Sequence, residues 1–170
     1  MSNKEPDVVN DNVPSIDALK SAFSEIPAGV AAVGVVNQEG EPDAMIVSTA
    51  TPVSLSPPLI SICMDKKSKT WQRMKGASCI GINILGSTSV DDLTSLRNPN
   101  YLDRFKSVKW RKTSSGSLML DNYAIHLDCK VHDTVDAGDH DLLLLRIVEL
   151  SQNETNTSLF YHRRSILPLD

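Results

Sequence analysis

The chain has 170 residues, of which 41% are hydrophobic and 22% are charged; this is the ordinary composition of one soluble globular domain with its own core. Its formal net charge of −4 argues against a nucleic-acid-binding protein, because such proteins carry a basic patch or stripe. No apolar run approaches the ~20 residues that a membrane helix needs. Residues 1–14 are polar with two prolines and resemble no signal peptide, so we expect a disordered arm at 1–14 and one cytoplasmic domain over 15–170.

The cysteine pattern argues against a metal or redox site. Cys63, Cys79 and Cys129 lie far apart, and no C-x-x-C pair is present. Zinc sites and redox dithiols need closely spaced cysteines, so we expect free, buried thiols in a reducing compartment. We predict no metal site.

The predicted elements follow one another as short strands and shorter helices. The N-terminal half shows a helix over 16–26 capped by Ser15, strands over 30–36 and 44–47 joined by a turn at 37–40, strands over 51–55 and 59–64, a helix over 69–75 capped by Ser68, and a strand over 79–85. The C-terminal half shows a helix from 89 to about 97, a short extended segment at 108–111, strands over 125–135 and 142–150 joined by a tight turn at 136–139, and a strand over 159–162.

The segment 125–135 carries the clearest alternation in the chain. Apolar residues occupy its odd positions up to a break at Asp133, while His126, Asp128 and His132 lie among the even ones. This pattern predicts an antiparallel strand with one buried face. Positions 126 and 132 would lie about 20 Å apart in a strand, too far to share a metal ion.

These elements predict a mainly β fold with short helices. Seven or eight strands are joined by hairpin-type turns, and alternating βαβ units are absent, so we expect a closed or nearly closed antiparallel barrel. A barrel of this size fills its interior with side chains; a large ligand must therefore bind outside, in a groove made by loops or by a second subunit. The strand over 142–150 is apolar at almost every position and needs cover on both faces, which predicts a homodimer.

Several motifs, in their order along the chain, resemble those of one known family. They are E-I-P-A-G-V at 25–30, M-I-V-S-T at 45–49, V-S-L-S-P-P-L at 53–59, D-K-K-S-K-T at 65–70, I-N-I-L at 82–85, D-R-F at 103–105, G-D-H at 138–140 and F-Y-H at 160–162. From about residue 19 to residue 161, the chain resembles the flavin reductase-like family of split-barrel proteins, which bind FMN or FAD. The chain departs from the family pattern at Ile46, Ala50, Pro52 and Arg164.

The resemblance implies a set of site residues. It implies that the 45–49 segment lies beside the flavin ring, that the 68–70 segment holds the phosphate, and that His140 lies near the nicotinamide as the catalytic residue. The implied cofactor-binding residues are Met45, Ile46, Val47, Ser48, Thr49, Ser68, Lys69, Thr70, Asn83, Phe105 and Tyr161.

Each of these residues also has a purely structural interpretation. Ser68 at a helix N-terminus suits a phosphate, but it equally suits an ordinary helix cap. Asn83 could bond to a flavin edge or to a neighbouring turn, and His140 could orient the nicotinamide, supply a proton or simply face solvent.

The resemblance implies hydride transfer from NADH or NADPH to FMN or FAD, as in the reductase component of a two-component monooxygenase. The departures at 46–52 motivate a second hypothesis, a non-catalytic flavin-binding module or electron-transfer flavoprotein. A barrel that has lost its flavin is a third. The motifs do not separate FMN from FAD, or NADH from NADPH.

Overall fold

The computed structural model describes residues 13–168; all but the last two residues of the predicted arm lie outside the described residues. Three α-helices are present in this part of the chain: α1 (Ile16–Ser24), α2 (Lys69–Met74) and α3 (Val90–Leu96). The hydroxyls of Ser15 and Ser68 cap α1 and α2, as predicted, by accepting bonds from the backbone N–H groups three residues later. None of the described helices is long and apolar enough to cross a membrane.

Most of the described chain forms β-strands, as the sequence predicts. In chain order they are β1 (Ala28–Gly29), β2 (Ala31–Val36), β3 (Pro42–Val47), β4 (Thr51–Leu55), β5 (Pro58–Asp65), β6 (Ile80–Leu85), β7 (Trp110–Lys112), β8 (Leu118–Leu120), β9 (Tyr123–Ala137), β10 (His140–Gln152), β11 (Leu159–His162) and β12 (Ser165–Pro168). The strands β1, β8 and β12 were not predicted. Each is short and lies beside a turn, where alternation gives little signal.

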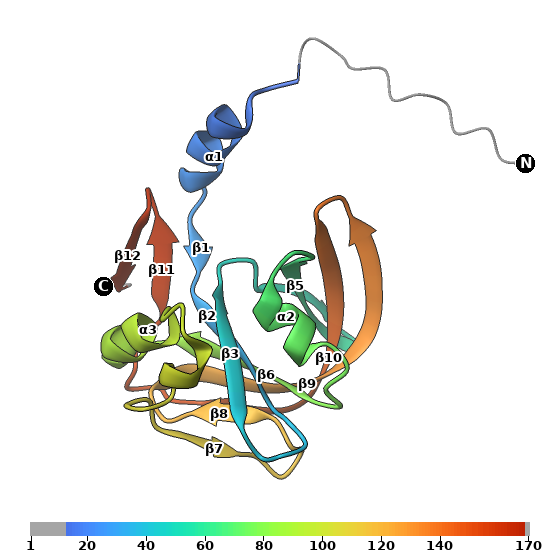
Figure 1. Cartoon of the computed structure of the whole chain (residues 1–170), viewed down its shortest axis with the longest axis vertical. Helices are drawn as coiled ribbons and strands as arrows, with labels where there is room; N and C mark the ends of the chain where they lie inside the picture. The colour runs from blue at the N-terminus through green and yellow to red at the C-terminus, as the bar shows by residue number, and fades with distance from the viewer. Residues whose placement is uncertain (1–12, 169–170) are drawn as a thin grey trace, which may run out of the picture.

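Seven strands form one antiparallel sheet in the order β3-β2-β6-β9-β10-β5-β4. Within the described residues its end strands, β3 and β4, do not pair with each other, so the barrel is split rather than closed. A three-stranded sheet, β1-β11-β12, lies below α1, and the long β9–β10 hairpin curves upward past α2 (Figure 1). The expected antiparallel split barrel is therefore confirmed.

The core lies on both sides of β2, whose first five residues are all buried. Val33 and Val35 pack in one apolar cluster with strands β5, β6 and β10, while Ala32 packs in a second cluster with α3 and β8. The hairpin of β7 and β8 lies close against β6: the carbonyl oxygen of Leu118 occupies the space that a Cβ on Gly81 would need.

The strand β9 confirms the predicted element but corrects its predicted burial. His126 and Asp128 on the polar face are only 2% and 1% exposed, while Val131 and Val135 on the apolar face are 47% and 43% exposed. The first half of β9 is covered on both faces, whereas the second half projects in the hairpin. The predicted break at Asp133 falls on a β-bulge, since the register against β10 shifts there.

The strand β10 is covered on one face only. Leu143 and Leu145 are buried, but Val148 and Leu150 are 43% and 67% exposed. The described residues of one chain thus do not supply the two-sided cover that the run over 142–150 predicts.

Candidate functional site

The candidate site begins at the end of the edge strand β3. Met45 is half-buried there, and its Sδ lies 3.9 Å from the hydroxyl of Ser68 at the start of α2. Beyond β3, Thr49 accepts a bond of 3.0 Å from the backbone N–H of Cys63 on β5. This bond holds the 48–49 segment against the sheet, and Ser48 is left exposed.

The N-terminus of α2 faces this segment. The hydroxyl of Ser68 accepts a bond of 3.2 Å from the N–H of Trp71; as a cap it uses a lone pair, so its O–H remains able to donate to an anion. Lys69 beside it is exposed. Such a pairing of a hydroxyl with a cation suits a phosphate group.

The loop before α2 is tied to the turn of the β9–β10 hairpin. The backbone N–H of Lys66 donates to the carbonyl of Asp139 at 3.1 Å, and the Lys66 ammonium donates to the carbonyl of Gly138 at 2.6 Å and pairs with Asp136 at 3.0 Å. Gly138 has φ +72°, which the tight turn requires. These bonds bring the predicted His140 next to the Ser68 loop, although 72 residues separate the two segments.

His140 is 40% exposed at its side chain and lies opposite Asp65 in the β5–β10 register. Its Nδ1 lies 2.7 Å from the Asp139 carboxylate, and this hydrogen bond lowers the pKa of Asp139. The carboxylate orients the imidazole and leaves its Nε2 side open to a ligand.

A groove of about 880 Å³ continues the site on the side of α1. Ser48, Thr49 and Tyr161, all predicted site residues, line it together with α1 and the turn between β11 and β12. Its volume is in the range of sites that hold nucleotide-sized ligands. Ile46 is half-buried and lines a smaller hollow that shares Ser48 and Tyr161 with the groove, whereas the side chain of Val47 is buried in the core.

Thr70 corrects part of the predicted phosphate site. It is 7% exposed, and its hydroxyl accepts bonds from Arg104 at 3.1 Å and from Arg73 at 3.3 Å. Arg73 in turn pairs with the buried Asp43 at 2.6 Å. Thr70 is therefore part of an internal ion-pair cluster, which the sequence did not reveal because its members lie on three separate elements.

Asn83 and Phe105 are not among the residues that line the groove. Asn83 is 0% exposed; its amide donates to the carbonyls of Ala32 and Leu118, and its oxygen accepts from the N–H of Leu120, so it cannot reach a flavin. Phe105 packs edge-to-face on Trp110 and lines a different hollow from Ser48, Thr49 and Tyr161.

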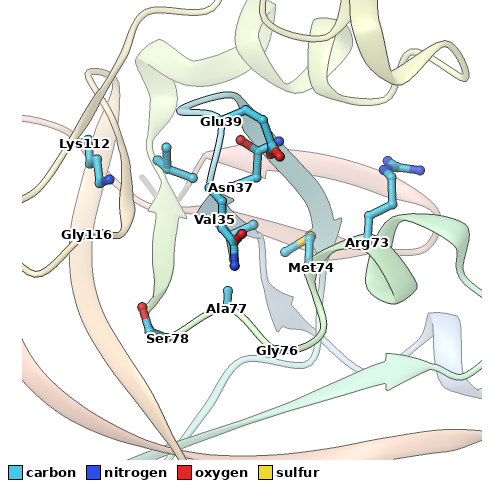
Figure 2. Close-up of a pocket in the computed structure, with 12 residues that line it drawn as sticks. Val35, Asn37, Glu39, Arg73, Met74, Gly76, Ala77, Ser78, Lys112 and Gly116 are labelled. Carbon is cyan, nitrogen blue, oxygen red and sulfur yellow. The ribbon is translucent and has the colours of Figure 1, made fainter.

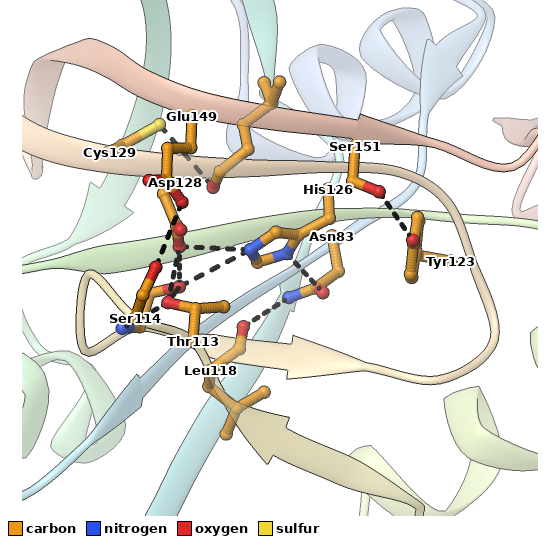
Figure 3. A network of polar contacts seen from close by, with 12 residues as sticks. Asn83, Thr113, Ser114, Leu118, Tyr123, His126, Asp128, Cys129, Glu149 and Ser151 are labelled. Atoms are coloured by element: carbon orange, nitrogen blue, oxygen red, sulfur yellow. Dashed lines mark hydrogen bonds and ion pairs between the residues drawn. The ribbon is translucent and has the colours of Figure 1, made fainter.

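Asn83 belongs to a buried polar network that joins β6, β8 and β9 (Figure 3). His126 lies 2.9 Å from Asn83 through Nδ1 and 3.1 Å from Asp128 through Nε2, and Asp128 also accepts from Ser117. Ser117 is 0% exposed, and its bonds with this histidine and aspartate stabilise the interior.

A hollow of about 460 Å³ lies on the other side of α2 (Figure 2). Asn37, Arg73 and Lys112 line it, but it contains none of the predicted site residues. The groove beside Ser48 and Thr49 is therefore the better candidate.

Sequence reasoning missed several contributors to that groove, which lie on α1 or just after it: Asp17, Lys20, Phe23, Ile26 and Ala28. The 16–26 helix was predicted, but its position was not. Arg164 also lines the groove, and the sequence singled it out only as a departure from the family pattern.

Comparisons with known proteins identify one family. A family model described as a flavin reductase like domain matches residues 23–170. A "probable flavin reductase" of Rhizobium meliloti is 31% identical over 139 residues, which is 82% of this chain and 44% of that protein. An "FMN reductase (NADH) RutF" of Cronobacter sakazakii is 30% identical over 152 residues, which is 86% of this chain and 89% of that protein.

A solved structure shows the same fold. It is the NADH:FAD oxidoreductase SgcE6 of Streptomyces globisporus in complex with NAD and FAD fragments, with a TM-score of 0.83, 24% identity, and coverage of 91% of this chain and 92% of that one. The chain spans only 44% and 60% of the length of two relatives from Rhizobium meliloti. The match over 23–170, with the split barrel, establishes that this chain belongs to the flavin reductase like domain family.

Proposed function

We propose that this chain is an NAD(P)H-dependent flavin reductase that acts on FMN or FAD. The proposal rests on one observation: three segments that are distant in the sequence lie side by side. Met45 contacts Ser68. The backbone bond from Lys66 to Asp139 brings the turn before His140 to the same place. The relatives named above as flavin reductase and FMN reductase (NADH) support the proposal.

The residues present fit a flavin. Its flat ring needs an apolar surface with backbone polar groups at the edge, and its phosphate needs hydroxyls or cations. The 45–49 segment is an edge strand with an exposed Ser48 at its end, and Ser68 and Lys69 supply the polar groups at the other side of Met45. Tyr161 adds aromatic surface in the groove.

Within this proposal, each group has a defined task. The backbone of 45–49 orients the ring through its N–H and carbonyl groups. Ser68 and Lys69 hold the phosphate, and His140, oriented by Asp139, positions the nicotinamide and can hold a proton at Nε2. The chemistry supplied by a bound flavin is acceptance of a hydride from the nicotinamide.

The test is a continuous assay of NADH and NADPH oxidation with FMN, FAD and riboflavin, with oxygen consumption followed in parallel. We expect flavin-dependent oxidation with a turnover of about 1–1000 s⁻¹. Stoichiometric flavin binding without oxidation would instead identify a non-catalytic flavin-binding module. Neither binding nor oxidation would indicate a barrel that no longer uses flavin.

We also propose that two copies form a homodimer. Exposed apolar side chains lie on the second face of β10, with Leu150 at 67%, and on β4, which is separated from β10 by β5, with Val53 at 51% and Leu55 at 97% exposed. Patches of this kind are normally covered by another subunit. Light scattering at micromolar concentration should give twice the chain mass of 18.6 kDa, and Leu150→Lys should shift the protein toward monomer. A wild-type monomer at that concentration would contradict the proposal.

A flavin-dependent monooxygenase is the partner we propose for the reduced product. A relative from Acinetobacter baylyi, 30% identical, is named as the reductase component of a trigonelline monooxygenase. We place the reaction in the cytoplasm, because buried thiols such as Cys79 and Cys129 are free, as expected in a reducing compartment.

A further inference from the structure

The turn between β11 and β12 has an unusual backbone for its sequence. His162 pairs with Ser165, so the loop consists of two residues, Arg163 with φ 51° and Arg164 with φ 63°. Two-residue hairpin loops with positive φ at both positions strongly prefer glycine and asparagine. An arginine in either position costs conformational energy, so a function for the side chains is the natural explanation.

The two arginines have different roles. Arg163 donates its backbone N–H to Ser24 at 2.7 Å and pairs through Nε with Glu25 at 2.9 Å, which fixes the turn against the end of α1. Arg164 lines the 880 Å³ groove instead. The backbone bond to Ser24, which does not depend on the side chain at 163, holds the turn next to the groove, whereas the exposed ion pair with Glu25 contributes little.

The groove combines cationic and aromatic groups. Lys20 on α1 and Arg164 supply positive charge, Asp17 supplies one negative charge, and Phe23 and Tyr161 supply flat apolar surface. Aromatic surface beside a pair of cations suits a nucleotide, whose base packs on the rings and whose phosphate pairs with a guanidinium.

This cationic pair lies away from the proposed flavin phosphate site. Ser68 touches Met45 at one end of the ring segment, whereas Ser48 and Thr49 at the other end line the groove with Arg164. Three residues of extended chain from 45 to 48 span about 10 Å, so the two positions at the ends of this segment suit two separate phosphate groups.

We propose that Arg164, assisted by Lys20, binds a phosphate group of the nicotinamide dinucleotide and so determines how tightly the electron donor is held. The inference rests on the proposed function for the identity of the ligand. A guanidinium bound to a phosphate makes charge-assisted hydrogen bonds, which are about twice as strong as neutral ones.

Arg164→Gly tests the proposal, and Arg163→Gly is its matched control. Both variants replace an arginine by glycine at a position with positive φ, but only Arg164→Gly removes a cation from the groove. With riboflavin as acceptor, the donor carries the only phosphates in the assay. We expect Arg164→Gly to raise KM for NADH about five- to tenfold with kcat unchanged, Arg163→Gly to stay within twofold, and Arg164→Lys to restore part of the affinity.

Binding of ADP, measured by calorimetry, provides a readout that does not depend on turnover. ADP should bind the wild type and lose affinity in Arg164→Gly alone. If the wild type oxidises neither donor but ADP binding still depends on Arg164, the reductase proposal fails while the phosphate site stands. If Arg164→Gly loses more affinity for NADPH than for NADH, the result supports the proposal and identifies the 2′-phosphate as the group that Arg164 binds.

Three outcomes would overturn the proposal. The first is an equal change of KM in the two glycine variants. The second is no change in either variant. The third is a loss of FMN affinity in Arg164→Gly with riboflavin and ADP unaffected, which would assign this cation to the flavin phosphate.

Discussion

Replacing Asp128 with alanine is expected to lower the free energy of unfolding by about 3–5 kcal/mol, because each buried donor left without its acceptor costs about 1–3 kcal/mol. Asp128 is 1% exposed and is the common acceptor for Ser117, Thr113 and His126. Its loss leaves these buried groups without their acceptor (Figure 3). Urea unfolding at pH 7, followed by circular dichroism, measures the difference.

Asp121→Ala is the matched control. Asp121 also pairs with a basic side chain, Arg111, at 3.0 Å, but both side chains are exposed. Exposed pairs contribute about 0–1 kcal/mol, so this variant should remain close to wild type. Equal losses in the two variants would show that burial of the network does not determine its contribution.

The Asp128 network also predicts how stability changes in acid. Burial by itself would raise the pKa of Asp128, but hydrogen bonds from Ser117, His126 and Thr113 outweigh it and lower the pKa below the ordinary 3.8. The resulting stabilisation is present above the unfolded-state pKa and is lost as the pH falls through the folded-state pKa. From pH 5 to pH 3, wild type should therefore lose more stability than Asp128→Asn, and parallel curves would contradict this expectation.

Ser68→Ala is expected to weaken FMN binding about 10- to 100-fold while riboflavin binding changes little. One hydrogen bond to a charged group contributes about 1.5–3 kcal/mol, and riboflavin has no phosphate. The substitution is confined to Ser68, because the hydroxyl of Thr70 is occupied by Arg104 and Arg73. Fluorescence titration of each flavin gives the two affinities.

Loss of the helix cap accompanies this substitution and needs its own control. Ser68 caps α2, and removal of such a cap costs about 1 kcal/mol of stability. Ser15 caps α1 in the same way, so Ser15→Ala reproduces the cap loss without touching the proposed phosphate position. If Ser68→Ala weakens FMN and riboflavin equally, Ser68 is a structural cap alone, and the phosphate binds elsewhere.

The strand β9 shows where prediction from the sequence stops. Its alternation correctly indicated an antiparallel strand, because side chains along a strand point to opposite faces. Alternation does not tell which face is covered. The hairpin of β7 and β8 brings Leu118 and Ser117 onto the polar face, where His126 and Asp128 find partners, so residues that were expected to face solvent became core.

The residues of the candidate site also fall into two groups: those whose role follows from the local sequence and those whose role depends on distant segments. Ser68 as a cap and Gly138 in its turn follow from local geometry, since each requirement is met within a few residues of chain. The burial of Thr70 and Asn83 depends on Arg104, Leu118 and Leu120 from other elements. No pattern within 68–70 or 82–85 contains that information.

The sequence by itself therefore determined most of the strands, the helix caps and the motifs that identify the family, because these depend on side-chain periodicity and on bonds between near neighbours. The tertiary structure decided which motif residues face a groove and which are buried. It also decided that Lys20 and Arg164, 144 positions apart in the chain, line the same groove. The physical reason is that a side chain's exposure and charge partners are set by the segments that pack against it, and in a split barrel most of those segments are distant in sequence.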